Sequence, residues 1–173
     1  MATVMRYQIA DYLAPKGGEY SLMGVGFNTL DENPNAQKDS KTYIHQKAQT
    51  SQIKSYQPTF PFDTDFIKGE AAVDAIFDIG RNYKTGADAE LDYVRVDLFD
   101  PVDGQENTFK ARKFTVAVEV AGITGEGGGI VKMTGNLNGV GDFVDGTFNT
   151  TTKKFTEGTA VATAAATEGE TEE

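Results

Sequence analysis

The sequence contains no cysteine and no tryptophan, and His45 is its one histidine. Without cysteine the chain can form neither disulfide bonds nor thiolate centres. A lone histidine gives almost no basis for a histidine metal site or a catalytic triad. Long apolar runs are absent as well, and no stretch has the length of a membrane-spanning helix. The sequence therefore predicts no metal, no cofactor and no membrane partner.

Basic residues are also scarce, because 16 Lys and Arg stand against 26 Asp and Glu and the net charge is −10. Nucleic-acid binding relies on Lys and Arg to displace phosphate counterions, so we expect no affinity for duplex DNA. Residues 157–173 hold five glutamates and no basic residue, which leaves −5 for residues 1–156. We predict one β domain over residues 1–156 and a disordered acidic tail over residues 157–173.

Glycine, phenylalanine and tyrosine are plentiful in this chain of one domain's length. That balance suits sheets and turns. The first residues, MATVMRYQIADYL, lack the basic and then apolar layout of a signal peptide. This favours a protein that is made and kept in a cytosol.

The clearest local pattern lies between Gly125 and Thr156, where short apolar stretches alternate with glycine and turn residues. Asn138-Gly139 and Asp145-Gly146 are pairs typical of tight hairpins. Because they lie only seven residues apart, we predict a hairpin turn at the first pair and a bulge or kink at the second. The glycines of residues 125–129 suggest a phosphate loop, but no Gly-Lys-Ser/Thr follows them, so we predict a flexible β turn.

Strands and one helix are predicted in the rest of the domain. Alternating apolar residues predict strands at 20–27, 53–62, 91–99 and 109–120, the last with Phe114, Val116, Val118 and Val120 inward and Thr115, Ala117 and Glu119 outward. A helical spacing of apolar residues predicts one α-helix at about 66–80, capped by Asp63 or Asp65 and ended by Gly80. The chain should therefore be mainly β, with a single flanking helix.

A long polar segment separates the first strands from this helix. Residues 31–52 contain only Tyr43 and Ile44 as large apolar groups, so the segment cannot bury enough surface to fold alone. We predict a long polar loop over residues 31–55. Loops of this length within a domain are uncommon and are usually functional or disordered.

Acidic residues suggest two kinds of site, and neither is supported by a motif. Asp97, Asp100, Asp103 and Glu106 lack the alternating ligand spacing of a calcium loop. The 26 acids could include a glycosidase-like pair, but nothing local nominates one. His45 has no catalytic partner nearby in the sequence. We therefore predict no catalytic, metal-binding or cofactor-binding residue and a protein that is not an enzyme.

Five stretches of the sequence carry a resemblance to a known family. The segment GNLNGVGDFVDGTFNTTTKKFT at 135–156 resembles the C-terminal signature of the major tail tube proteins of long-tailed, siphovirus-like bacteriophages. Four others are similar to that family in the same order: IADYL at 9–13, LMGVGFNTLDENPNAQKDSKTYIHQK at 22–47, SYQPTFPFDTDFI at 55–67 and ARKFTVAVEV at 111–120. Together they span nearly the whole chain up to Phe155.

The resemblance implies a β-sandwich or barrel-like subunit that forms hexameric rings, which stack into the phage tail tube. It implies a structural virion protein, made in the host bacterial cytoplasm, whose tube conducts the genome into the host. The implied partners are further copies of the chain, the tape measure protein inside the tube, and the tail terminator and tail tip proteins. Viral DNA would pass through the lumen without specific binding.

The resemblance also implies where the subunit makes contacts. In the family the long loop touches neighbouring subunits and the next ring, which nominates Tyr43, Ile44 and Tyr56 as inter-subunit contacts. An acidic lumen would let DNA slide, and Glu119 is a candidate for its lining. Two alternatives stay open: a tube subunit of a contractile tail or related bacterial injection or secretion system, and a small β-sandwich binding module or hydrolase.

Overall fold

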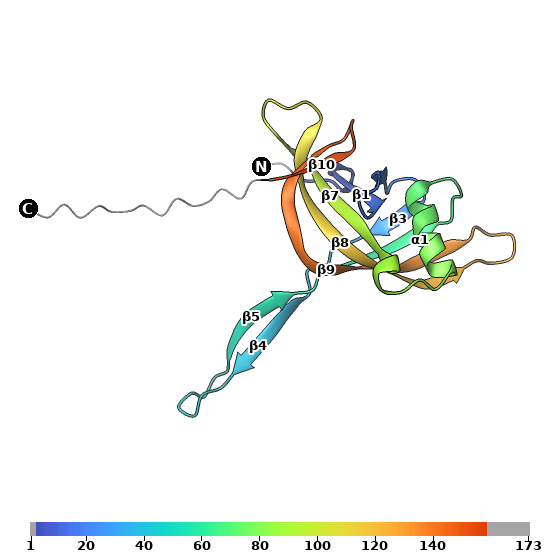
Figure 1. Cartoon of the computed structure of the whole chain (residues 1–173). Helices are drawn as coiled ribbons and strands as arrows, with labels where there is room; N and C mark the ends of the chain where they lie inside the picture. Colours follow the sequence, from blue (N-terminus) through green and yellow to red (C-terminus); the bar gives the residue numbers. More distant parts are fainter. Residues whose placement is uncertain (1–2, 159–173) are drawn as a thin grey trace, which may run out of the picture.

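A computed structural model describes residues 3–158, which form a curled sheet, one α-helix and a projecting two-stranded arm (Figure 1). The strands of the main sheet follow the order β2-β1-β7-β8-β9-β6-β3, with β10 beside β9, and every pairing is antiparallel. The sheet curls into a half-barrel, which confirms the predicted mainly β fold. The strands are β1 (Ile9–Pro15), β2 (Ser21–Leu22), β3 (Phe27–Leu30), β4 (Ala36–Lys41), β5 (Thr50–Tyr56), β6 (Thr59–Asp65), β7 (Glu90–Pro101), β8 (Thr108–Thr124), β9 (Lys132–Asn149) and β10 (Lys154–Glu157), and the helices are η1 (Arg6–Gln8), α1 (Ala71–Arg81) and η2 (Gly86–Ala89).

The long strand β8 has the face assignment that its alternating sequence predicts. Phe114, Val116 and Val118 are buried, whereas Glu119 is exposed. The chain then turns through the glycines of residues 125–129 into β9, and the amide of Gly129 donates to the carbonyl oxygen of Glu126 at 2.9 Å. The predicted β turn is therefore confirmed.

Neither turn pair within β9 makes a turn, so the hairpin predicted at Asn138-Gly139 is wrong. Asn138 pairs with β8 on one side and with β6 on the other. A side chain on Gly139 would place its Cβ 2.7 Å from the Pro58 ring, so glycine is needed there for a close approach of two strands. The irregularity predicted at Asp145-Gly146 lies instead at Gly141–Phe143, where three residues of β9 oppose one of β8 and Gly141 has a φ of 72°.

Two other strand predictions are altered. The strand predicted at 20–27 is divided into β2 and β3, and the one predicted at 53–62 is divided at Gln57-Pro58 into β5 and β6. Proline is usually confined to edge strands, yet Pro61 lies in β6 between β9 and β3. The Pro61 carbonyl accepts a hydrogen bond from the Asp31 amide at 3.0 Å, so Pro61 faces the chain just beyond the end of β3. Because the ladder between β3 and β6 ends here, the absence of an N–H on Pro61 costs little.

Helix α1 packs on the sheet, beginning five residues later than predicted and ending one residue beyond the predicted end at Gly80. The helix begins after Glu70, which makes no side-chain capping bond, and Asp63 and Asp65 belong to β6 instead. Gly80 does not end the helix, which continues to Arg81. The glycine serves a different purpose, because α1 approaches β8 so closely that a Cβ on Gly80 would lie 2.8 Å from the Val120 side chain.

Gly80→Ala should therefore lower the stability of the folded chain despite the better helix propensity of alanine. Alanine gains about 1 kcal/mol in a helix, but forcing a methyl group into filled space typically costs about 1–3 kcal/mol. We expect a lower midpoint of thermal unfolding by circular dichroism. Gly127→Ala is the control, because a Cβ there meets open space. An unchanged or higher midpoint for Gly80→Ala would show that the helix can shift away from Val120 at no cost.

The buried side chains form two clusters on opposite faces of the sheet. The larger joins α1 to the sheet, with Val73 and Ile76 of the helix against Phe60, Phe114 and other residues of the strands. The smaller is centred on Tyr12, Val94, Val96 and Phe148. β7 contributes to both clusters and is therefore buried on both faces. No arm residue belongs to either cluster.

Most of the segment predicted as a long polar loop, 31–55, is a β-hairpin. β4 and β5 pair from Ala36 opposite Tyr56 to Lys41 opposite Thr50, with an irregularity at Lys54. We predicted a loop because the segment has little apolar surface to bury. The two strands are instead defined by the hydrogen bonds between their backbones, which do not depend on apolar side chains. We call residues 36–56 the arm.

The acidic C-terminal segment is only partly described. Glu157, the first residue of the predicted tail, is the last residue of β10 and pairs with Gly146 of β9. The rest of the predicted tail, residues 159–173, lies outside the described residues. Between residues 3 and 158, no helix combines the length and the apolar character needed to cross a membrane.

Candidate functional site

The arm stands away from the body of the molecule and is exposed along its whole length (Figure 1). Each residue from Ala36 to Tyr56 is exposed, although twelve residues of the two strands are paired with each other. A hairpin that buries nothing in its own subunit contributes little to that subunit's stability. Its side chains are available to a partner instead.

The tip of the arm presents apolar and aromatic groups to solvent. Tyr43 is 55% exposed, and Ile44 is fully exposed. The backbone turns here through a hydrogen bond from the Gln46 amide to the Tyr43 carbonyl, 2.9 Å long, and the Tyr43 ring lies 6.0 Å from the stacked ring of His45. The structure thus places two predicted contact residues together at the far end of the arm.

One face of the hairpin is partly apolar. Ser40 and Ser51 lie opposite each other with their hydroxyl oxygens 3.0 Å apart, and the pair Lys38 and Ile53 lies two residues along on the same face. Ile53 is 56% exposed and Tyr56, nearer the body, is 59% exposed. The sequence analysis named Tyr56 as a contact residue but did not name Ile53, although it placed both residues in the strand predicted at 53–62.

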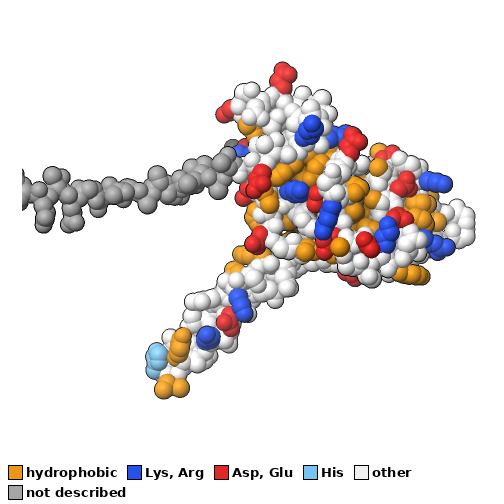
Figure 2. All heavy atoms as spheres, viewed as in Figure 1, with side chains coloured by type: hydrophobic (Ala, Val, Ile, Leu, Met, Phe, Trp, Pro, Cys, Tyr) orange, Lys and Arg blue, Asp and Glu red, His pale blue; other side chains and the backbone are white. Residues whose placement is uncertain are grey.

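The arm differs from the body in charge. The arm carries four lysines and one aspartate, a net charge of +3. Because the net charge of the whole chain is −10, the residues outside the arm carry a net charge of −13. Lysines are visible along the arm in Figure 2, with the tip histidine and apolar groups beyond them. Within residues 3–158, none of the arm lysines is in an ion pair, whereas eight basic residues of the body are.

A buried polar network fastens the strands next to the arm's root. The Asp11 carboxylate accepts hydrogen bonds from the Tyr93 hydroxyl at 2.6 Å, from Arg95 Nε at 3.0 Å and from the Arg6 guanidinium at 2.6 Å. Arg95 also donates to Glu32 at 2.9 Å and to the Leu30 carbonyl at 3.2 Å. Burial, and then the Asp11 charge, raise the pKa of Tyr93 well above its ordinary value. The network joins β1 and β7 to the chain that leads from β3 into the arm.

A hollow of about 510 Å³ lies at the root of the arm. Tyr56 and Lys54 of the arm form one side, and Phe143 and Arg112 of the body form the other. The Arg112 guanidinium lies 5.6 Å from the centre of the Phe143 ring, a cation–π distance. The hollow thus combines aromatic surface with two cationic and two acidic side chains, the acids being Glu32 and Asp142.

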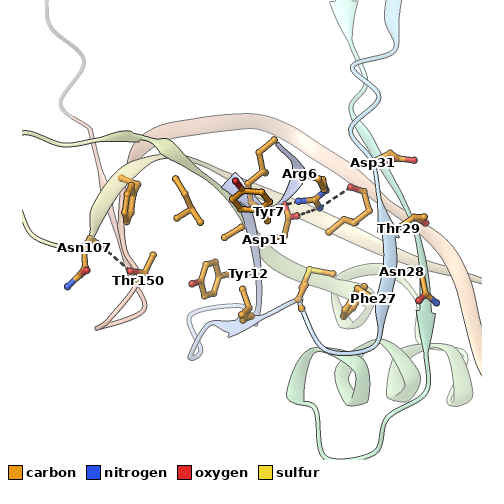
Figure 3. A pocket seen from close by; sticks show the side chains of 18 residues that line it. Arg6, Tyr7, Asp11, Tyr12, Phe27, Asn28, Thr29, Asp31, Asn107 and Thr150 are labelled. Carbon is orange, nitrogen blue, oxygen red and sulfur yellow. Dashed lines mark hydrogen bonds and ion pairs between the residues drawn. The ribbon is translucent and has the colours of Figure 1, made fainter. Parts of the chain in front are cut away.

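A larger groove, of about 930 Å³, separates β1 from β3 (Figure 3). Tyr7 and Tyr12 belong to one wall and Phe27 to the other. Arg6 spans the two walls, because it donates to Asp11 and, at 3.2 Å, to the carbonyl of Leu30 on β3. The groove marks the place where the half-barrel stays open.

Glu119 lies on the open polar face of the sheet. Its neighbour Val120 packs against α1, so Glu119 points to the opposite face. Asn138 donates to its carboxylate at 3.1 Å. Thr115 and Thr59 lie on the same face as Asn138 on adjoining strands, and they are partly exposed. This half of the face is therefore polar, and it also carries Glu90, which lies opposite Ala117.

The other residues weighed in the sequence do not gather into a site. Asp100 pairs with Lys110 at 2.8 Å, and burial raises the pKa of Asp97. Residues 3–158 contain no group of three or more His, Cys, Asp or Glu placed to hold a metal. His45 lies at the arm's tip, far along the hairpin from the body.

No protein-family model and no curated protein matches this chain. Among solved structures, a chain in the "Cryo-EM structure of the anti-feeding prophage (AFP) baseplate, 6-fold symmetrised" superposes with a TM-score of 0.49 and 4% sequence identity. The superposition covers 84% of this chain and 96% of that chain. At this identity and TM-score, no residue role carries over from one chain to the other.

Proposed function

We propose that this chain is a structural subunit that polymerises into the tail tube of a long-tailed bacteriophage. Copies join laterally into rings, hexameric by family analogy, and the rings stack into a hollow tube that conducts the viral genome into the host. The role is that of a scaffold and conduit, with no catalytic step. The proposal rests on the resemblance of five ordered sequence stretches and on the architecture of the exposed arm.

The arm is the observation that carries the proposal. It exposes the apolar side chains of Tyr43, Ile44 and Ile53 to water. Exposed apolar surface of this kind marks a site of interaction with another protein. An exposed strand pair with apolar side chains can also pair with strands of other chains. Proteins that stay monomeric normally prevent such pairing by covering or charging their exposed strands. In an assembling subunit, the same features provide the contact. The tip projects away from the body of its own subunit, so it can contact the body of another copy. Such contacts join two different surfaces. Repeated, these head-to-tail contacts generate rings or open-ended stacks.

The polar sheet face around Glu119 is the proposed lining of the lumen. Its threonine and asparagine side chains carry no positive charge that would bind the DNA phosphates, and the negative net charge of the chain repels them. DNA would then slide past without specific binding. In the virion tail, the remaining partners would be the tape measure protein inside the tube and the terminator and tip proteins at its ends.

Negative-stain electron microscopy of the concentrated, purified protein tests the proposal. We expect rings or hollow tubes of constant diameter, and a mass above that of the 18.7 kDa monomer by light scattering. Addition of duplex DNA should produce no salt-sensitive complex with the unassembled subunit. A protein that stays monomeric at all concentrations would contradict the proposal and would favour a binding module.

A further inference from the structure

The groove between β1 and β3 exposes apolar surface in a concave place (Figure 3). Apolar and aromatic side chains make up most of its lining, and two of them are open to solvent, Tyr7 at 77% exposure and Leu22 at 49%. β3 is the last strand of the main sheet on this side, so among the described residues no other strand pairs with its free edge. A concave apolar surface of this kind is suited to receive side chains of a partner.

The wall of the groove formed by β3 carries negative charge. Asp31 lines the groove just beyond the end of β3, and Asp63 lies opposite Thr29 of the same wall. Within residues 3–158, neither aspartate is in an ion pair. The other two charged residues of the lining, Arg6 and Asp11, pair with each other at 2.6 Å. The groove therefore combines apolar surface with acids that lack a cationic partner.

The tip of the arm has the complementary composition. Tyr43 and Ile44 are its exposed apolar groups, and Lys41 and Lys47 flank them in the sequence. Neither lysine is in an ion pair in the part of the chain that the structure describes. An apolar centre with positive charge on both sides matches an apolar groove with negative charge along one wall.

The other hollows of the body match the tip less well. The hollow at the arm's root is lined by the cationic groups of Lys54 and Arg112, which repel the lysines of an incoming tip. A third hollow, of about 320 Å³, is bordered by Lys113 and offers Phe155 as its one aromatic group. The groove between β1 and β3 is therefore the best receptor among the three.

The tip that enters the groove comes from a different subunit. The arm leads from its root at Ala36 to Gln46 over roughly 35 Å at the usual rise of a strand. It projects away from the body that bears the groove (Figure 1). A subunit therefore presents its tip and its groove at separate places, each open to another copy.

We infer that the groove between β1 and β3 of one subunit receives the arm tip of a second copy. Tyr43 and Ile44 enter the groove, and the two lysines beside them face Asp31 and Asp63. The inference rests on the proposed function, which it deepens by naming the surface that the arm contacts. Because the contact joins two different surfaces, each added copy brings a new free tip and a new free groove, and the contact repeats.

Cross-linking between two variants of the full chain tests this contact. The chain has no cysteine, so His45→Cys at the tip and Thr29→Cys in the groove each supply a single thiol. The two variants are mixed under conditions of assembly and treated with a short bifunctional maleimide, and an affinity tag on one chain identifies the mixed dimer by its mass. We expect the mixed dimer to be the main product. Tyr83→Cys replaces Thr29→Cys in the control, because Tyr83 is 87% exposed but lies outside the groove, and it should give little mixed dimer.

A charge reversal tests the role of the acidic wall. Asp31→Lys in the Thr29→Cys chain should lower the yield of mixed dimer several-fold, because it places a positive charge against the lysines of the tip. Asp88→Lys is the matched control, since it makes the same change of charge at an exposed site that does not line the groove. Circular dichroism checks that both variants fold.

Three outcomes would overturn the inference. Regular tubes that give no more mixed dimer than the Tyr83→Cys control would place the tip elsewhere and leave the proposed function standing. Dimers formed only between two tip thiols would show that arms contact each other. Equal yields from the Asp31→Lys and Asp88→Lys chains would show that the acidic wall does not hold the tip. Failure of the proposed function has a separate sign, because the unmodified chain would then form neither rings nor tubes.

Discussion

Asp11→Ala should lower the free energy of unfolding by about 3–5 kcal/mol, the cost of removing one partner from a buried ion pair. The Asp11 side chain is 1% exposed and the Arg95 side chain is 6% exposed, so the arginine would keep its charge in a buried site with Glu32 as its remaining carboxylate partner. The Tyr93 hydroxyl would lose its acceptor at the same time. We expect aggregation during expression or a much lower denaturation midpoint.

The matched control is an exposed ion pair on the same molecule. Lys84→Ala removes a partner of Asp78, and both side chains lie in solvent at the end of α1. Exposed pairs contribute little to stability, so this variant should unfold almost as the unmodified chain does. Chemical denaturation followed by circular dichroism measures both variants. Equal, small effects would mean that water enters the network and solvates Arg95.

Tyr43→Ser combined with Ile44→Ser should abolish tube formation while leaving the monomer folded. The two side chains are the apolar tip of the arm, and interface energy concentrates in a few such groups when a partner buries them. Neither residue belongs to the two buried clusters, so folding does not depend on them. Electron microscopy should show no tubes, and circular dichroism and the melting temperature should match those of the unmodified chain.

A conservative variant separates the loss of apolar surface from a general disturbance of the tip. Tyr43→Phe with Ile44→Val keeps both positions apolar and should still form tubes. Regular tubes from the serine variant would show that the tip is not the inter-ring contact. Unfolding of the serine monomer would mean that the arm supports the body after all.

The sequence predicted best where side-chain alternation reports directly on burial. Phe114, Val116 and Val118 lie inward because period-two apolar residues must face a core whatever the topology. The helical spacing of apolar residues, with Val73 and Ile76 three positions apart, likewise predicted the face of α1 that is buried. These positions depend on the chemistry of single side chains and need no knowledge of distant neighbours.

The failures share a different cause, namely contacts between segments far apart in the chain. The Asn138-Gly139 pair is typical of a turn, but the glycine is required because Pro58, about eighty residues away in the sequence, packs against it and leaves no room for a Cβ. Gly80 likewise reads as a helix stop until Val120 is placed beside it. The buried pairing of Asp11 with Arg95 left no local signal, because charged residues in strands are usually exposed. The arm was missed since its strands bury no side chain.

The pairing of β8 with β9 has a mechanical consequence. The two strands run antiparallel along almost their whole lengths, from Thr108 opposite Asn149 to Thr124 opposite Lys132. A pull along the strand axis loads these hydrogen bonds in shear, so they share the force and must break together. A pull across the strands would peel them apart one at a time. A wall built from such subunits therefore resists stretching along β8 far better than it resists tearing between strands.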